Sequence, residues 1–181
     1  MSDAGSIELP PWAVVSPRRR AHIIRVASLL DAWADAIHLD PSARSAWRDA
    51  ARFHDALRDA PEEELRRLSP DIDLPAPIRH GPAAAARLAA DGESRADVLE
   101  AVRWHTVGRV EWARTGRALY MADFLEPGRR FDRDVRRAIA AEVPDDFDRA
   151  FGRVVRLRIE WTLREGKAIH PETVRLWEAV R

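Results

Sequence analysis

The sequence predicts an all-α protein with a single domain. Prolines and glycines divide the 181-residue chain into segments of helical length, and apolar residues recur in these segments at helical spacing. None of the segments shows a convincing strand pattern. A chain of this length is long enough for one core and too short for two comfortable ones. We therefore expect a bundle of about eight or nine helices.

Each predicted helix begins near a proline or a capping side chain, and several end at a glycine or a proline. Asp40 and Pro41, for example, supply a cap and a first-turn proline, and a proline-rich loop is predicted over residues 69–77. In chain order, the predicted helices are residues 18–37, residues 41–54, a short helix from Pro61, an alanine-rich helix from His80 to about Asp91, a helix capped by Ser94 that reaches His105 before Gly108, and residues 114–126, 132–142, 146–165 and 171–180.

Composition excludes several classes of function. The chain has no cysteine, so disulfides, thiolate nucleophiles and zinc–thiolate sites are ruled out. Its formal net charge is zero, which argues against a dedicated nucleic-acid binder. No apolar run is long enough to span a membrane, and residues 1–16 lack the features of a secretory signal. These observations fit a cytoplasmic protein that works without nucleic acid or membrane.

Six side chains of metal-ligand type fall on apolar helical segments or at their ends: His22, His54, Asp55, His80, His105 and Asp123. Asp123 is the least ordinary, because it stands in a strongly apolar segment and a buried carboxylate needs a partner. Asp55 has two carboxylate oxygens with which it could bridge two ions. Imidazole and carboxylate ligands without thiolate favour iron, manganese or a similar ion over structural zinc.

Each of these residues also has an ordinary interpretation when taken alone. His22 would be a core histidine, and His80 would be a capping or loop residue at a helix start. His105 would interact with the dipole at the end of its helix. The joint pattern favours a metal site. His38 and His170 are not included in that site, although a role for His170 on the substrate side stays open.

The order of the six residues resembles that of the HD-domain metal-dependent phosphohydrolases. Within that superfamily, five stretches are similar to the YqeK family of bacterial enzymes: Phe53–Arg58, Arg79–Pro82, Ala101–Arg109, Ala122–Arg129 and Ile169–Thr173. The resemblance covers residues 18–181, so residues 1–17 are interpreted as an N-terminal extension and 18–181 as one HD domain.

The resemblance implies an activity and a set of ligands. The YqeK family cleaves diadenosine tetraphosphate symmetrically into two ADP and is associated with iron. By carry-over, His22, His54 and Asp123 with Asp55 would hold one metal ion, and Asp55, His80 and His105 would hold the second. A metal-activated water would attack phosphorus in line while the two ions neutralise developing charge.

Four further residues are candidates for contacts with the polyphosphate: Arg58, Thr106, Arg109 and Arg129. Arg58 is also a candidate catalytic residue beside Asp55, and it stands where the family usually has lysine. The planar guanidinium of arginine, with its paired donors, then replaces the compact ammonium charge of lysine. Residues 110–116 are less typical of the family. Each arginine could instead be a solvated surface residue.

Two other functions stay open at this point. The same metal centre would serve another HD-domain nucleotidase or phosphodiesterase, and an HD protein could also bind nucleotide without hydrolysing it. The expected partner is a dinucleoside polyphosphate, and a homodimer is possible.

Overall fold

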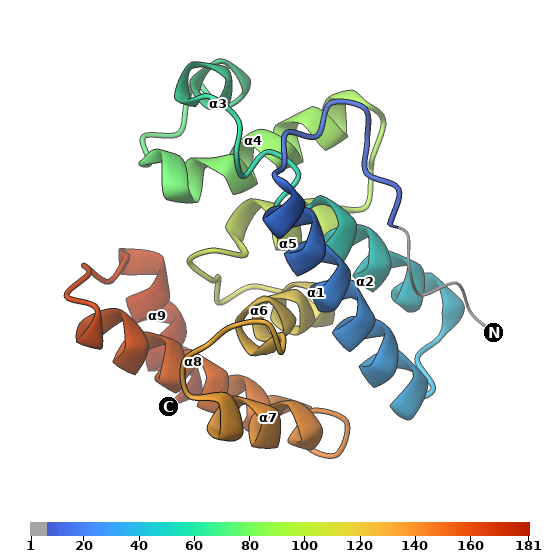
Figure 1. Ribbon diagram of the computed structural model, residues 1–181, viewed down its shortest axis with the longest axis vertical. Coiled ribbons are helices and arrows are strands. Elements are labelled where there is room, and N and C mark those ends of the chain that lie inside the picture. The colour runs from blue at the N-terminus through green and yellow to red at the C-terminus, as the bar shows by residue number, and fades with distance from the viewer. Residues whose placement is uncertain (1–6) are drawn as a thin grey trace.

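Nine α-helices and no strand make up residues 7–181, the part of the chain that this computed structural model describes (Figure 1). The helices are α1 (Pro17–Ala36), α2 (Pro41–Phe53), α3 (Glu62–Leu68), α4 (Ala76–Ala90), α5 (Ala96–Trp104), α6 (Arg114–Leu125), α7 (Arg133–Glu142), α8 (Phe147–Arg164) and α9 (Pro171–Val180). The predicted all-α bundle is confirmed. The first six residues of the predicted N-terminal extension lie outside the described residues.

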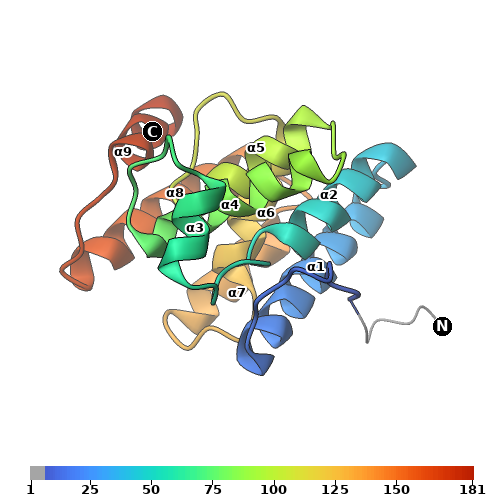
Figure 2. The same ribbon diagram turned by 90° about the horizontal axis from the view of Figure 1, so that it is seen from above.

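The centre of the bundle is α6, which packs against α1, α2, α5, α7 and α8 (Figures 1 and 2). Its side chains are buried from Ala118 to Leu125. Most of them are apolar, so burial of this helix supplies much of the hydrophobic driving force for folding. Asp123 is the exception, since it places a carboxylate at the middle of the molecule.

Local capping explains where the first two helices begin. The Ser16 side chain accepts a hydrogen bond from the Arg19 backbone N–H ahead of α1. The Asp40 side chain accepts from the backbone N–H groups of Ser42 and Ala43, as predicted for a cap of α2. These bonds satisfy N–H groups that have no partner within the helix.

The prediction for the start of α4 was wrong. The helix begins at Ala76, not at His80, so the proline-rich loop ends at Pro75 and His80 lies inside the helix. Pro77 is tolerated because first-turn N–H groups have no helical partner to lose. Pro82 stands within the helix and removes one hydrogen bond, yet it is fully packed in the interior.

The predicted cap of α5 was also wrong. Arg95, not Ser94, occupies the capping position, and no side chain caps the helix. The Arg95 backbone N–H instead donates to the Glu93 carboxylate, and the Arg95 guanidinium donates to the same group. A local ion pair therefore fixes this turn where a serine cap was expected.

The residues before α1 pack on the rest of the molecule. The Trp12 ring stacks on Phe53 with 6.5 Å between centroids, and its indole N–H donates to Asp91. The Val14 backbone N–H donates to the carbonyl of Ala56 at 2.8 Å. This segment therefore supports the end of α2, where the His54-Asp55 pair lies.

The last helix packs on the loop between α5 and α6. The Thr173 hydroxyl donates to the Val107 carbonyl at 2.6 Å, although 66 residues separate the two along the chain. Gly108 has a φ of 86°, and a Cβ there would lie 2.5 Å from a methyl carbon of Leu176. The loop that follows His105 is thus held from outside by α9.

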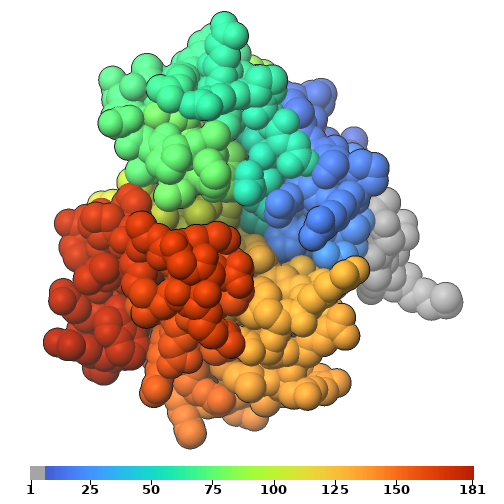
Figure 3. Space-filling view, turned by 60° about the vertical axis from the view of Figure 1, so that its left-hand side comes forward, coloured from blue at the N-terminus to red at the C-terminus, as the bar shows by residue number. Residues whose placement is uncertain are grey.

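Segments from both ends and the middle of the sequence meet on one face of the molecule. Figure 3 shows the surfaces of the N-terminal, central and C-terminal parts of the chain around the middle of that face. No helix within residues 7–181 is long and apolar enough to cross a membrane.

Candidate metal site

The structure brings all six predicted ligands together in the interior. They form two groups, one of His22, His54 and Asp123 and the other of Asp55, His80 and His105, and within each group the ligand atoms lie within 4.8 Å of one another. Helices α1, α4 and α6 contribute three of the six, and the ends of α2 and α5 contribute the others. All six side chains are buried.

In the first group, ring nitrogens and a carboxylate converge. The Nε2 atom of His22 lies 3.1 Å from Oδ1 of Asp123 and 3.4 Å from Nε2 of His54. The second group is similar: Nε2 of His80 lies 3.1 Å from Nε2 of His105. In both groups the same ring nitrogen of each histidine faces its neighbours.

Asp55 lies between the two groups. Its Oδ1 is 3.0 Å from His80 Nε2 and 3.5 Å from His105 Nε2. Its Oδ2 is 3.5 Å from His22 Nε2 and 3.4 Å from His54 Nε2. Each oxygen therefore faces one group, which is the arrangement that a bridging carboxylate needs.

Hydrogen bonds orient two of the rings for ligation. Nδ1 of His54 lies 2.8 Å from the Ala51 carbonyl, and Nδ1 of His105 lies 2.8 Å from the Val102 carbonyl. A carbonyl can only accept, so Nδ1 carries the proton in each ring and Nε2 presents its lone pair. Second-shell bonds of this kind are typical of metal-ligating histidines.

The protonation of His105 and Asp55 matches the chemistry of a metal ligand. Burial lowers the pKa of His105 to about 4, so this ring is neutral near pH 7. Burial opposes ionisation of Asp55, but the electrostatic influence of His54, together with that of His105 and His80 beside it, holds the Asp55 pKa well below its usual range. Neutral imidazole and ionised carboxylate are the forms that bind a cation.

His22 and Asp123 are more strongly paired. Burial opposes a charge on His22, yet hydrogen bonds to Asp123 and Glu126 raise the His22 pKa to about 9. For Asp123, burial is outweighed by the charge of Arg129 and the bond to His22, and its pKa is held well below the usual range. Cation binding here must therefore displace a proton from His22 at neutral pH.

Three arginines from distant parts of the chain contact the two ligand carboxylates. Arg19 Nη1 lies 2.6 Å from Asp55 Oδ2, Arg129 Nη2 lies 2.6 Å from Asp123 Oδ1, and Arg158 Nη1 lies 3.4 Å from Asp123 Oδ2. The Arg158 side chain also donates to the Thr106 carbonyl at 2.9 Å. These guanidinium groups offset the negative charge of the cluster.

The predicted substrate-contacting residues separate into two pairs. Arg129 contacts Asp123, and the Thr106 hydroxyl lies 3.2 Å from His105 Nε2, so both adjoin the cluster. The Arg109 side chain instead pairs with Glu111 and lies over the Trp104 ring. The Arg58 side chain makes no hydrogen bond or ion pair within residues 7–181, and its role toward substrate stays a prediction.

Sequence reasoning missed Arg19, Arg158 and Glu126. Arg19 precedes His22 by three residues on one helix, and Glu126 follows Asp123 by three, so helical spacing could have drawn attention to both. Arg158 has no comparable signal, because it comes from α8 and reaches Asp123 only through the fold.

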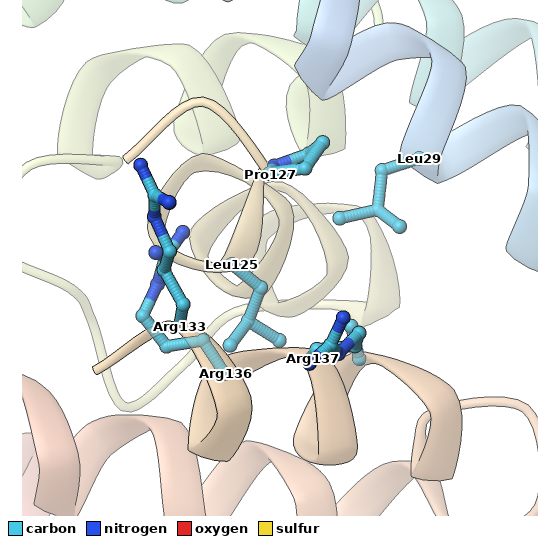
Figure 4. Close-up of a pocket in the computed structure, with 7 residues that line it drawn as sticks. Leu29, Leu125, Pro127, Arg133, Arg136 and Arg137 are labelled. Atoms are coloured by element: carbon cyan, nitrogen blue, oxygen red, sulfur yellow. The ribbon is translucent and has the colours of Figure 1, made fainter. Parts of the chain in front are cut away.

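A separate groove of about 290 Å³ lies between α1 and α7 (Figure 4). Its lining is mostly apolar and consists of Leu29 from α1, Leu125 and Pro127 at the end of α6 and just after it, and Ala140 and three arginines of α7. Arg136 there is buried and donates to the backbone carbonyls of Phe124, in the last turn of α6, and of Glu126, directly after it. None of the six candidate ligands lines this groove.

Comparison with known families agrees with this geometry. The family model described as "HD domain" matches residues 19–148, most of the chain, and this range contains all six candidate ligands. The chain belongs to the HD-domain family. It is thus a member of a group of metal-dependent phosphohydrolases, as its motifs predicted. HD domains bind divalent metal ions, and the two ligand groups provide suitable donors.

Two curated relatives carry the same name, "Bis(5'-nucleosyl)-tetraphosphatase, symmetrical". The one from Bacillus subtilis is 27% identical over 133 residues, which is 68% of this chain and 70% of the relative. The one from Halalkalibacterium halodurans is 26% identical over 133 residues, which is 69% of this chain and 70% of the relative. Both agree with the YqeK-type branch that the sequence motifs indicated.

The fold also matches a crystal structure from Clostridium acetobutylicum, described as a predicted HD superfamily hydrolase involved in NAD metabolism. The TM-score is 0.78 at 23% identity, and the match covers 92% of this chain and 90% of the other. At this identity the match establishes the shared fold. The helices that hold the six ligands therefore belong to the HD-domain architecture.

Proposed function

We propose that the protein hydrolyses a dinucleoside tetraphosphate symmetrically into two nucleoside diphosphates, with two cations held by the two ligand groups. The observation that carries this proposal is the position of Asp55, which turns one oxygen toward each histidine group. The names of the curated relatives supply the substrate class. The two parts are independent, since the first concerns the site and the second its substrate.

The donor set fits two divalent ions. It consists of four imidazole nitrogens and two carboxylates without sulfur, a mixture that suits iron or manganese. When bound, such ions supply a hydroxide nucleophile near neutral pH and neutralise charge on phosphate oxygens. His54 and His105 would serve as neutral ligands fixed by their carbonyl partners, and Asp55 would be shared between the ions.

The arginines around the cluster are suited to hold the polyphosphate. Arg19, Arg129 and Arg158 reach the ligand carboxylates from α1, the α6–α7 connection and α8, so they surround the place where reacting phosphates would lie. A guanidinium presents paired donors that match phosphate oxygens. Arg158 is the most fixed of the three, because it also lies over the Tyr120 ring at 4.4 Å.

The test is product identification with metal-loaded protein purified without air. The full chain, supplied with Fe²⁺ or Mn²⁺, should convert diadenosine tetraphosphate into ADP alone, as seen by chromatography. Formation of ATP and AMP would show asymmetric cleavage and would refute the proposal. Turnover of mononucleotides or cyclic dinucleotides in place of the tetraphosphate would favour another HD phosphohydrolase activity. Tight nucleotide binding without any product would favour a nucleotide sensor.

Two ligand variants test the bridging role of Asp55. Asp55→Ala removes an oxygen from both groups, so metal analysis should find both ions lost. His80→Ala removes a ligand from one group only and should mainly weaken the second ion. Two ions still bound to Asp55→Ala would contradict the shared ligand.

The proposed contact between Arg158 and the polyphosphate is tested by comparing two arginines of α8. Arg158→Lys keeps a positive charge but loses the fork, and we expect the KM for the tetraphosphate to rise about tenfold or more. Arg156→Lys is the matched control, because Arg156 is exposed and pairs with Glu160 on the same helix. Equal kinetic changes in the two variants would argue against a phosphate contact at Arg158.

A further inference from the structure

Glu126 is a buried carboxylate that contacts a candidate ligand without belonging to either ligand group. It is the residue directly after α6, and it is 2% exposed. Its Oε1 lies 3.1 Å from Nδ1 of His22. Because a carboxylate only accepts, this contact keeps a proton on Nδ1 and leaves Nε2, which faces Asp123, as the ligand atom.

Glu126 is itself held from the other side. Its Oε2 accepts from Arg25 Nε at 2.5 Å and from the Gly128 backbone N–H at 2.6 Å. A Cβ at Gly128 would lie 2.3 Å from Arg25 Nε, so only glycine leaves room for this contact. Arg136 anchors the same residue by donating to its backbone carbonyl. The carboxylate is therefore fixed in place before any cation binds.

The other three histidines lack such a partner. The Nδ1 atoms of His54 and His105 donate to neutral backbone carbonyls of their own helices. Nδ1 of His80 is buried and has no hydrogen-bond partner within residues 7–181. Among the four ring ligands, a charged group thus lies behind His22 alone.

We propose that Glu126 is a positioning residue that strengthens cation binding at the His22–His54–Asp123 group and leaves the Asp55–His80–His105 group little affected. A carboxylate behind a ligating imidazole fixes its ring and makes its free nitrogen a better donor. Partners of this kind typically change metal affinity by about 10–100-fold. Binding of the cation is measured without nucleotide, so the inference stands or falls apart from the proposed hydrolysis.

The charge of Glu126 and its mechanical role can be separated. Glu126→Gln keeps an oxygen that accepts from His22 but removes the charge. Arg25→Met keeps the His22 and Gly128 contacts and removes the cation that offsets the charge. If the charge matters, Glu126→Gln weakens cation binding, whereas Arg25→Met holds or raises the affinity. If Glu126 only braces the connection after α6, both variants weaken it alike.

The experiment is calorimetric titration of the metal-free full chain with Mn²⁺. In wild type we expect two binding steps, and in Glu126→Gln one of them should weaken by about 10–100-fold while the other stays within about threefold. Asp97→Asn is the control for loss of a carboxylate remote from the cluster, where Asp97 accepts from Thr115. It should leave both steps in place.

A second background assigns the affected step. His80→Ala weakens the other group, so the tighter remaining step belongs to His22–His54–Asp123, and adding Glu126→Gln must weaken that step. The proposal is overturned if the step is unchanged there, if Glu126→Gln weakens both wild-type steps equally, or if Arg25→Met weakens binding as much as Glu126→Gln. Thermal unfolding of each metal-free variant confirms that the chain remains folded during titration.

Discussion

Replacing Gly81 by alanine should separate the two helices that carry His80 and His105. Gly81 is the sixth residue of α4 and lies against the end of α5. A Cβ at this position would lie 2.7 Å from the carbonyl oxygen of Arg103 and 2.9 Å from that of Val102. Both obstacles are backbone atoms, so no rotamer change relieves them, and the helices must move apart by about 0.7 Å to restore an ordinary contact of 3.4 Å.

The size of the effect follows from two opposing terms. Alanine is favoured over glycine inside a helix by about 1 kcal/mol. An overpacked contact costs up to about 3 kcal/mol when the backbone must shift. Gly81→Ala should therefore lose about 2 kcal/mol of stability, which lowers the Tm by about 4–8 °C in a chain of this length. The shift should also weaken Mn²⁺ binding, since His105 Cε1 lies 3.3 Å from the new methyl group.

Gly152→Ala is a matched control for this prediction. Gly152 is also the sixth residue of its helix, α8, and its Cβ would meet only the Val180 carbonyl at 3.4 Å, an ordinary contact. This variant should gain about 1 kcal/mol, or about 2–4 °C in Tm. Thermal unfolding of the metal-free proteins compares the two. If Gly81→Ala is as stable as Gly152→Ala, the close approach of α4 and α5 is wrong.

Two further predictions concern stability away from the ligands. Gly108→Ala should lose about 3 kcal/mol of stability, because it combines a positive φ with a clash against Leu176. Gly92→Ala has a φ of 99° but no neighbour within 4 Å, so it should lose only about 1 kcal/mol. Equal Tm values for the two variants would contradict the packing of α9. The hydrogen bond from Arg95 lowers the pKa of Glu93 to about 2. This pair therefore stabilises the fold above about pH 4.5, by about 1 kcal/mol after screening by solvent. The stabilisation is lost as the pH falls toward 2. In unfolding curves measured at several pH values, Glu93→Gln should lack this loss of stability in acid. If its stability falls with pH as steeply as that of the wild type, a group other than Glu93 causes the loss.

The sequence sufficed to predict the helices and the six side chains that the structure brings together, because both leave local signals. Proline and glycine mark most helix ends, and polar ligands such as Asp123 stand out against apolar neighbours. The start of α4 escaped prediction because Pro77 and Pro82 look like helix breakers, while a first-turn position and tight packing make them tolerable. Prediction from local sequence thus failed where packing in the interior determined where the helix begins.

The contacts that no local pattern could predict are those between distant side chains. Arg158 meets Asp123 across 35 residues, and Glu126 meets His22 across 104. By contrast, Arg109 lies inside a family-like motif, and the structure pairs its side chain with Glu111. Proximity in sequence to a candidate ligand therefore pointed correctly to Thr106 and Arg129, but not to Arg109, and it gave no signal for Arg158.

The contact between Thr173 and Val107 sets an order of events during synthesis of the chain. All six candidate ligands leave the ribosome before α9 does, since the last of them is Asp123. The loop after His105 gains its hydrogen bond and its Leu176 cover only when the C-terminal helix arrives. A nascent chain that does not yet include α9 therefore carries all six candidate ligands, but the loop after His105 still lacks its contacts with that helix. We expect the loop after His105 to become fully ordered only once α9 has been synthesised and has packed against it.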